Sequence, residues 1–173
     1  RDAGTGQLLD QSIYLRSTES ADRMQGEVHA LIDEPFEQVR QQLSRAAQWC
    51  DVLMVIVSGG PATRHLINTE VLDALGPQGF LVNVARGSVV DEQALVLALQ
   101  QGRIAGAGLD VFEHEPLPAN SPLLAMNNVV ALPHIGSATH ETRHAMARCA
   151  ADNLIKALVG TLRENLVNPQ VLE

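Results

Sequence analysis

The chain has 173 residues, of which 46% are hydrophobic and 18% charged, so it is long enough for one ordinary domain with a packed core. Its net charge of −8 disfavours nucleic acid as a partner, because proteins that bind nucleic acid usually present a basic face. No apolar run approaches the roughly 20 residues that span a bilayer, no signal peptide opens the chain, and the 2 cysteines form no CxxC pair, so we expect a cytoplasmic protein outside the membrane.

Apolar runs in the first part of the chain alternate between strand-like and helix-like patterns. The short run 13–15 predicts a strand, and the segment 34–48, with Pro35 in its first turn and apolar residues at helical spacing, predicts a helix. The continuous apolar run 52–57 predicts a strand that is buried on both faces and ends at the glycine-containing turn 58–61.

The alternation continues through the rest of the chain. Asp91 is a suitable N-cap and Gly102 a suitable C-terminal stop for the helix between them. We predict helices over 69–75, 91–101 and 139–159, strands over 80–84, 104–109 and 129–132, a proline-rich loop over 113–122 and an irregular tail from 161. Strands that alternate with helices are typical of an α/β fold with a parallel sheet.

Polar residues follow successive predicted strands at the point where each strand ends. Arg86, Asp110 and His134 occupy these positions. In open α/β sheets, ligands bind beyond the carboxyl ends of the strands. The three side chains are therefore expected to form one site.

Three segments around these residues resemble signatures of the D-specific 2-hydroxyacid dehydrogenases. The segment 83–92 (NVARGSVVDE) is similar to the arginine signature of that family, 108–116 (GLDVFEHEP) to its acidic signature, and 133–137 (PHIGS) to its histidine signature. They occur in the family's order and at its spacing, and the resemblance runs from about residue 50 to 169. It implies an incomplete Rossmann-type parallel sheet flanked by helices, with a C-terminal helix and tail.

The resemblance also implies an activity, the reduction of a small 2-oxo acid such as glyoxylate, hydroxypyruvate or 2-ketogluconate. Arg86 suits the substrate carboxylate, because a planar guanidinium grips it through two parallel hydrogen bonds. His134 suits proton donation to the carbonyl oxygen. Glu115 would accept a hydrogen bond from the imidazole and fix its tautomer. The resemblance assigns these three roles to these three positions.

A nicotinamide cofactor would supply the hydride. In dinucleotide-binding folds an acidic residue after the second strand binds the ribose 2′-hydroxyl, whereas an arginine there accommodates a 2′-phosphate. The predicted strand 13–15 is followed by Arg16 and Ser17, so we expect NADP, with NAD as the alternative if Arg16 is only an exposed basic residue. The resemblance implies that Asp110 accepts a hydrogen bond from the nicotinamide carboxamide. The expected cofactor-binding residues are Arg16, Ser17, Val84, Ala85, Arg86, Asp110, His134, Gly136 and Ser137.

Each of these residues also has a structural interpretation. Arg86, before a glycine, can be a solvated turn residue, and His134, after a proline, can be structural. We assign surface or structural roles to the remaining histidines, which are His29, His65, His114, His140 and His144. No group of histidine, cysteine and carboxylate residues has zinc-like spacing, so we expect no metal.

Two parts of the family pattern are absent. There is no split substrate domain, and Gly4-Thr5-Gly6 resembles only the start of the glycine-rich phosphate turn, which also needs a preceding strand. The turn 58–61 lacks the expected proline-containing form. Without the first strand of the fold, we expect an unpaired central edge in the sheet.

We therefore interpret the chain as a fragment of a longer enzyme or as a degenerate gene product. We expect the isolated chain to show little or no turnover. We assign 1–145 to a truncated dinucleotide-binding domain and 146–173 to a C-terminal helix and tail that would return to the missing substrate domain. The alternative is a non-catalytic nucleotide-binding or dimerisation module, like the corepressors that share this fold. The resemblance also implies a homodimer.

Overall fold

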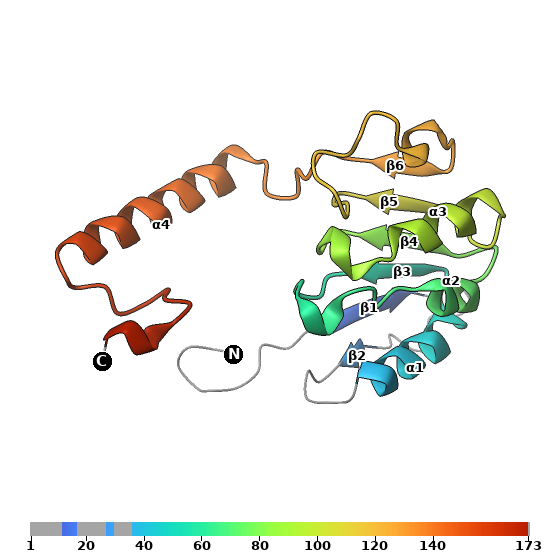
Figure 1. Ribbon diagram of the computed structural model, residues 1–173, viewed down its shortest axis with the longest axis horizontal. Coiled ribbons are helices and arrows are strands. Elements are labelled where there is room, and N and C mark those ends of the chain that lie inside the picture. Colours follow the sequence, from blue (N-terminus) through green and yellow to red (C-terminus); the bar gives the residue numbers. More distant parts are fainter. Residues whose placement is uncertain (1–11, 17–26, 30–35, 173) are drawn as a thin grey trace. The chain divides into compact units, whose positions relative to one another are not determined.

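The computed structural model describes residues 12–16, 27–29 and 36–172 (Figure 1). The chain divides into two compact units. One unit comprises Leu8–His134 and contains the sheet, whereas Ile135–Glu173 belongs to the other. The predicted domain boundary between 145 and 146 stays a prediction.

Within the described residues, the first unit contains a 6-stranded sheet with the order β2-β1-β3-β4-β5-β6. The four strands from β3 to β6 are parallel to one another, as the sequence predicted. The strands are β1 (Ser12–Arg16), β2 (Glu27–His29), β3 (Val52–Val55), β4 (Phe80–Asn83), β5 (Gly106–Leu109) and β6 (Val129–Ala131).

The prediction of an unpaired central edge was wrong. β1 pairs antiparallel with β3, with Tyr14 opposite Met54 and Arg16 opposite Val52. β1 also pairs antiparallel with β2 on its other side. An exposed strand edge leaves backbone N–H and C=O groups without partners, and the antiparallel pairing supplies partners to β3.

Two of the three described helices of the first unit begin or end at signals that the sequence carries. α2 (Thr69–Leu75) begins after Asn68, whose side chain accepts from the Val71 N–H, and ends at Gly76, where φ is 78°. α3 (Glu92–Gln100) begins after Asp91, whose carboxylate accepts from the Ala94 N–H at 3.0 Å. The predicted cap of α3 is therefore confirmed. α1 (Phe36–Ala47) packs against α2, and α2 packs against α3.

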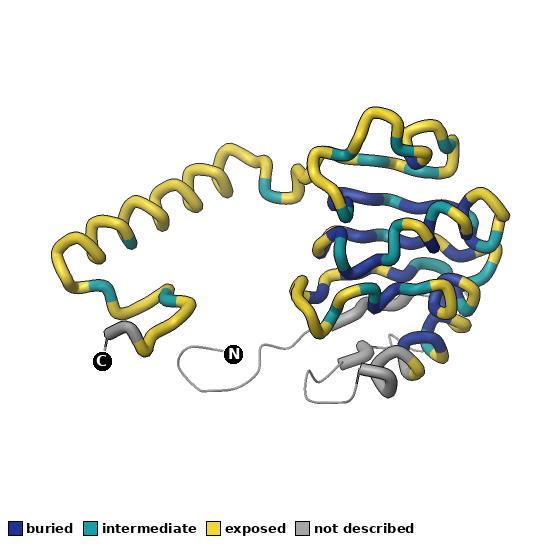
Figure 2. Tube along the Cα trace, viewed as in Figure 1, coloured by how far each residue is buried: buried dark blue, intermediate teal, exposed yellow. Residues whose placement is uncertain are grey.

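The core lies between these helices and the middle strands, and the most buried stretches of the chain follow β3, β4 and β5 (Figure 2). Its fully buried side chains include Leu43, Leu53, Leu72, Leu81 and Leu95. The prediction that β3 is buried on both faces was wrong, because burial alternates along it. Met54 is 38% exposed while its neighbours Leu53 and Val55 are fully buried, so only one face of β3 packs into the core.

The second unit contains the long helix α4 (His140–Leu158), which begins and ends as the sequence predicted. The Thr139 side chain accepts from the Thr142 N–H, and Val159 and Gly160 follow the last turn. A short 3-10 helix, Pro169–Leu172, follows later in the tail. Across the described ranges, no helix combines the length and the apolar character that crossing a membrane requires.

Candidate active site

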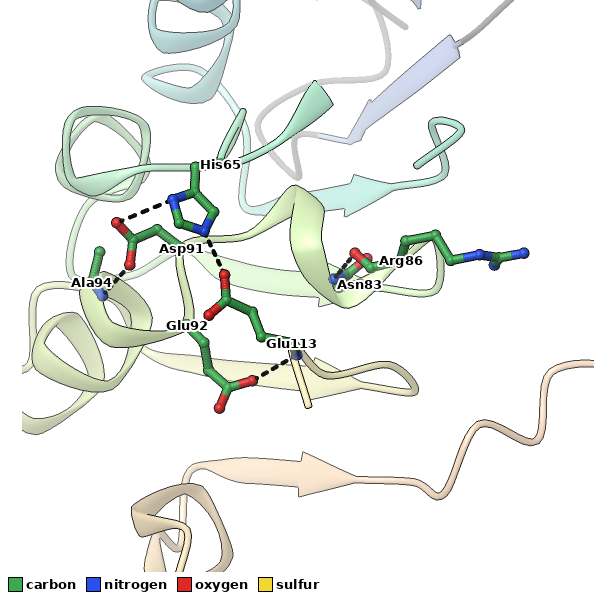
Figure 3. Close-up of polar contacts among 7 residues, drawn as sticks. All are labelled: His65, Asn83, Arg86, Asp91, Glu92, Ala94 and Glu113. Atoms are coloured by element: carbon green, nitrogen blue, oxygen red, sulfur yellow. Dashed lines mark hydrogen bonds and ion pairs between the residues drawn. The ribbon is translucent and has the colours of Figure 1, made fainter. Parts of the chain in front are cut away.

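The turn after β4 is held by a buried polar side chain, Asn83, which is 1% exposed. Its Oδ1 accepts a hydrogen bond from the Ala85 N–H at 3.1 Å, and its Nδ2 donates to the Arg86 carbonyl at 3.1 Å (Figure 3). An asparagine suits this place because its amide supplies both an acceptor and a donor. Asn83 therefore fixes the backbone that carries Arg86, whose side chain is exposed.

Two glycines allow the loops after β3, β4 and β5 to approach one another. A Cβ on Gly59 would lie 2.6 Å from Cγ of Arg86, so the arginine stem lies directly against this glycine. A Cβ on Gly87 would lie 1.8 Å from the carbonyl oxygen of Phe112. No larger residue fits at Gly87 without moving the backbone after β5.

A carboxylate and an imidazole meet at the end of the sheet. His134 Nδ1 lies 2.7 Å from Glu115 Oε2, and the Phe112 N–H donates to the other carboxylate oxygen at 3.0 Å. Because an ionised carboxylate only accepts, Nδ1 of His134 carries the donated proton and Nε2 is left for a ligand. His134 has a φ of 56°, in the left-handed region that non-glycine residues seldom adopt.

The surroundings of Glu115 favour its charged form. Partial burial raises the pKa of Glu115. The hydrogen bonds from His134 and Phe112, together with the charges of His134 and Arg86, lower it by a larger amount. The net effect places the pKa below its ordinary value of 4.5. Glu115 is therefore ionised at neutral pH, as an acceptor for the His134 imidazole must be.

Arg86, Glu115 and His134 line one pocket of about 420 Å³. The strand-end positions predicted that Arg86 and His134 would gather and the resemblance added Glu115, and the structure brings these three side chains together. The pocket is lined by Gly59, Arg86, Gly87, Ser88, Phe112, Glu113, Glu115 and His134.

The other predicted site residues lie in different places. Val84 is 47% exposed and Ala85 is buried in the turn after β4. Asp110 is buried at the end of β5, where its N–H donates to the Asn83 carbonyl at 3.0 Å, and it does not line the pocket. Their roles toward a cofactor stay predictions.

Some predicted cofactor residues cannot be related to the pocket. The expectation that Arg16 follows a parallel strand at the cofactor edge was wrong, because β1 is antiparallel and Arg16 pairs with Val52 at the amino end of β3. Ser17 lies outside the described residues. Gly136 and Ser137 belong to the second unit. In the part of the chain that the structure describes, no group of three or more histidine, cysteine, aspartate or glutamate residues could hold a metal ion.

Sequence reasoning missed a polar cluster behind the pocket. His65 Nε2 is hydrogen-bonded to Glu113 Oε1, and Nδ1 lies 3.9 Å from Asp91 Oδ2 (Figure 3). The Glu113 N–H donates to Glu92 Oε2 at 3.0 Å. His65 and Glu113 are 48 residues apart, so no local motif joins them; the only available signal was that Glu113 lies two positions before Glu115.

Comparison with known proteins places this architecture in a family. Residues 20–136 match the family described as D-isomer specific 2-hydroxyacid dehydrogenase, NAD binding domain. The chain is 53% identical over 144 residues to glyoxylate/hydroxypyruvate reductase B of Yersinia pestis (strain Pestoides F), a match that covers 83% of this chain and 44% of that protein. The protein of the same name from Serratia proteamaculans (strain 568) is 52% identical over 145 residues, or 84% of this chain and 45% of the relative.

Solved structures with the same fold include enzymes with bound nucleotide. The NADPH-dependent glyoxylate/hydroxypyruvate reductase from Sinorhizobium meliloti, in complex with NADP and malonate, is 54% identical with a TM-score of 0.63 and covers 66% of this chain and 35% of its own. The D-isomer specific 2-hydroxyacid dehydrogenase from Xanthobacter autotrophicus Py2, in complex with NADPH and MES, is 39% identical with a TM-score of 0.61. The match covers 77% of this chain and 54% of that protein. The chain spans less than half the length of the curated relatives named above.

Proposed function

This chain belongs to the D-isomer specific 2-hydroxyacid dehydrogenase family and matches its NAD-binding domain, and from that premise we propose that the protein transfers a hydride between a nicotinamide cofactor and a small 2-oxo acid. The observation that carries the proposal is one pocket lined by a guanidinium and by a hydrogen-bonded carboxylate–imidazole pair. Glyoxylate and hydroxypyruvate are the first substrates to test, because the relatives from Yersinia and Serratia are named for them.

Arg86 is the anchor for the substrate in this proposal. Its guanidinium can hold a carboxylate through two parallel hydrogen bonds, and Gly59 lets its stem lie flat at the pocket wall. A pocket of about 420 Å³ falls within the size range of small-molecule sites. A 2-oxo acid held by its carboxylate would present its carbonyl group within this pocket.

His134 is the proton donor, and Glu115 orients it. The hydrogen bond from Nδ1 to Glu115 directs Nε2 to the open side, where it can give a proton to the carbonyl oxygen during reduction. In the reverse direction the same nitrogen takes the proton from the hydroxyl group. The negative charge of Glu115 stabilises the protonated imidazole.

The residues at the strand ends fit a nicotinamide group. Val84 offers a half-exposed apolar surface after β4, and Asp110 follows β5 at the same edge, where dinucleotides bind in such sheets. When bound, the nicotinamide supplies the hydride. The NADPH-dependence of the Sinorhizobium relative supports a preference for NADP. Arg16 adds no support, because the antiparallel pairing of β1 places it beside Val52, at the amino end of β3.

A kinetic test separates an enzyme from a nucleotide-binding module. In the protein that carries this chain, His134→Ala should lower kcat for glyoxylate and hydroxypyruvate by about 10²–10⁴ while cofactor binding, followed by fluorescence, is retained. His114→Ala is the matched control, because His114 is exposed on the loop before Glu115. Cofactor binding without any turnover by the unaltered protein would favour the non-catalytic module.

The same fluorescence titration compares NADPH with NADH, and tighter binding of NADH would overturn the proposed cofactor preference.

We further propose that the protein is a homodimer and that it is cytoplasmic. Sedimentation equilibrium tests the homodimer. Cys50 and Cys149 are both free thiols, in keeping with a reducing compartment.

A further inference from the structure

His65 connects the segment before α2 to the loop that carries Glu115. Its backbone N–H donates to the Ser88 carbonyl at 2.9 Å, and the next pairing joins Ile67 to Val89 at 3.0 Å. The φ of His65 is 52°, so its backbone occupies a costly region that these neighbouring hydrogen bonds maintain. The backbone of His65 is therefore held by hydrogen bonds to the segment after β4.

The ring of His65 lies between two carboxylates. Glu113 Oε1 is hydrogen-bonded to Nε2, and Asp91 Oδ2 lies 3.9 Å from Nδ1. Asp91 is itself fixed, because its other oxygen caps α3 at the Ala94 N–H. His65 and Glu113 are both partly buried, with side chains 33% and 24% exposed, so their contact is shielded better than a surface pair.

Glu113 is held at both its backbone and its side chain. The Glu113 N–H donates to Glu92 Oε2, and its carboxylate bonds to His65. The carboxylates of Asp91 and Glu113 thus lie at the two nitrogens of one imidazole, and without that ring the Glu113 side chain would lose its hydrogen bond and be free to move. Glu113 also lines the pocket, so such a movement would change the wall of the site.

The loop that Glu113 anchors also carries the acid–base pair. Phe112 precedes Glu113 and donates its N–H to Glu115, and Glu115 in turn bonds to His134. We propose that His65 is a positioning residue: by holding Glu113 it fixes the Phe112–Glu115 loop, and so keeps the Glu115 carboxylate on the imidazole of His134. This inference rests on the proposed function only for its effect on rate; its structural content can be measured separately.

The direct test uses the Phe112 amide as a reporter of Glu115 in the ¹⁵N-labelled chain. The chemical shift of this amide follows ionisation of the carboxyl group to which it donates. In His65→Ala the midpoint of this acid titration should rise toward 4.5, because Glu115 loses its hydrogen bonds. His65→Gln, whose amide can still donate to Glu113, should keep the original midpoint, and Glu115→Gln should abolish the titration.

The controls separate positioning from folding. Spectra are compared only where the amides of β5 retain their native shifts, and Glu113→Ala, which removes the same contact from the other side, should reproduce the effect of His65→Ala. An unchanged midpoint in a folded His65→Ala or Glu113→Ala chain would overturn the inference.

The kinetic test distinguishes failure of this inference from failure of the proposed function. In the protein that carries this chain, His65→Ala should lower kcat with little change in KM, and His65→Gln should recover it. A raised midpoint in a protein that has no reductase activity would leave the positioning role intact and overturn the proposed function. If the unaltered protein is active and His65→Ala changes neither the midpoint nor kcat, the proposed function stands and the positioning role of His65 is overturned.

Discussion

At the scale of single residues, the site depends on side chains that hold other groups in place. Asn83 satisfies two backbone groups of the turn that presents Arg86, although no substrate would touch it. Glu115 takes one hydrogen bond from its own loop and one from His134. Arg86 and His134, the residues proposed to bind substrate, are exposed, whereas Asn83 is buried, so a buried side chain holds the backbone of an exposed site residue.

The lowered pKa of Glu115 predicts an acid-sensitive contribution to stability. A carboxyl group whose pKa is lower in the folded state stabilises the fold above its unfolded pKa, and this contribution disappears as pH falls through the folded value. The wild-type chain should therefore be more stable than Glu115→Gln at pH ~7 and lose that advantage well below pH 4.5. Urea unfolding of both chains across this range measures the difference. A difference independent of pH would contradict the assignment.

At the scale of elements, the loops after β4 and β5 are in close backbone contact. Gly87 lies against the Phe112 carbonyl, and the Phe112–Glu115 loop carries the contacts to His65, Glu92 and His134. Parallel strands bring these loops to one edge of the sheet. Close backbone contact then determines their spacing.

This contact predicts different outcomes for two glycine substitutions. Gly87→Ala should lower the free energy of unfolding by about 1–3 kcal/mol, because its Cβ has no room beside Phe112. Gly108→Ala is the matched control, since a Cβ there would meet only Val82 Cγ2 at 3.8 Å, an ordinary contact. Chemical denaturation measures both, and equal losses would show that the loops can move apart.

At the scale of the whole molecule, the buried core lies in the first unit, whereas the long helix of the second unit is exposed. The core cluster runs from Leu43 to Leu123 within the first unit. None of the residues of α4 is buried, and Leu154 and Leu158 are 61% and 78% exposed. Among the described residues, packing of the sheet against α1–α3 is therefore the main source of stability.

The division predicts the effect of leucine substitutions along the chain. Leu81→Ala should cost about 2–5 kcal/mol, because Leu81 is fully buried at the centre of the sheet. Leu158→Ala should change the free energy of unfolding by less than about 0.5 kcal/mol. Denaturant titrations of the two variants decide the matter, and a comparable loss in Leu158→Ala would mean that α4 is buried in solution.

The sequence by itself determined the positions of most helices and strands, the parallel direction of β3 to β6, and the strand-end positions of Arg86 and His134. These follow from short-range signals: apolar periodicity, caps such as Asp91 and Thr139, and polar residues placed at strand ends. Parallel strands then bring their ends to a common edge, which is why Arg86 and His134 could be predicted to gather, whereas Glu115 was assigned to the site only by the family resemblance.

Only the tertiary structure decided which distant groups contact one another. The antiparallel pairing of β1 with β3, the exposure of one face of β3, and the contact of His65 with Glu113 all depend on how the chain folds back on itself. The sequence around each residue leaves several partners equally possible. Close packing at Gly87 decides one of these contacts, because it sets the place of the Phe112–Glu113 backbone and so brings Glu113 within reach of His65.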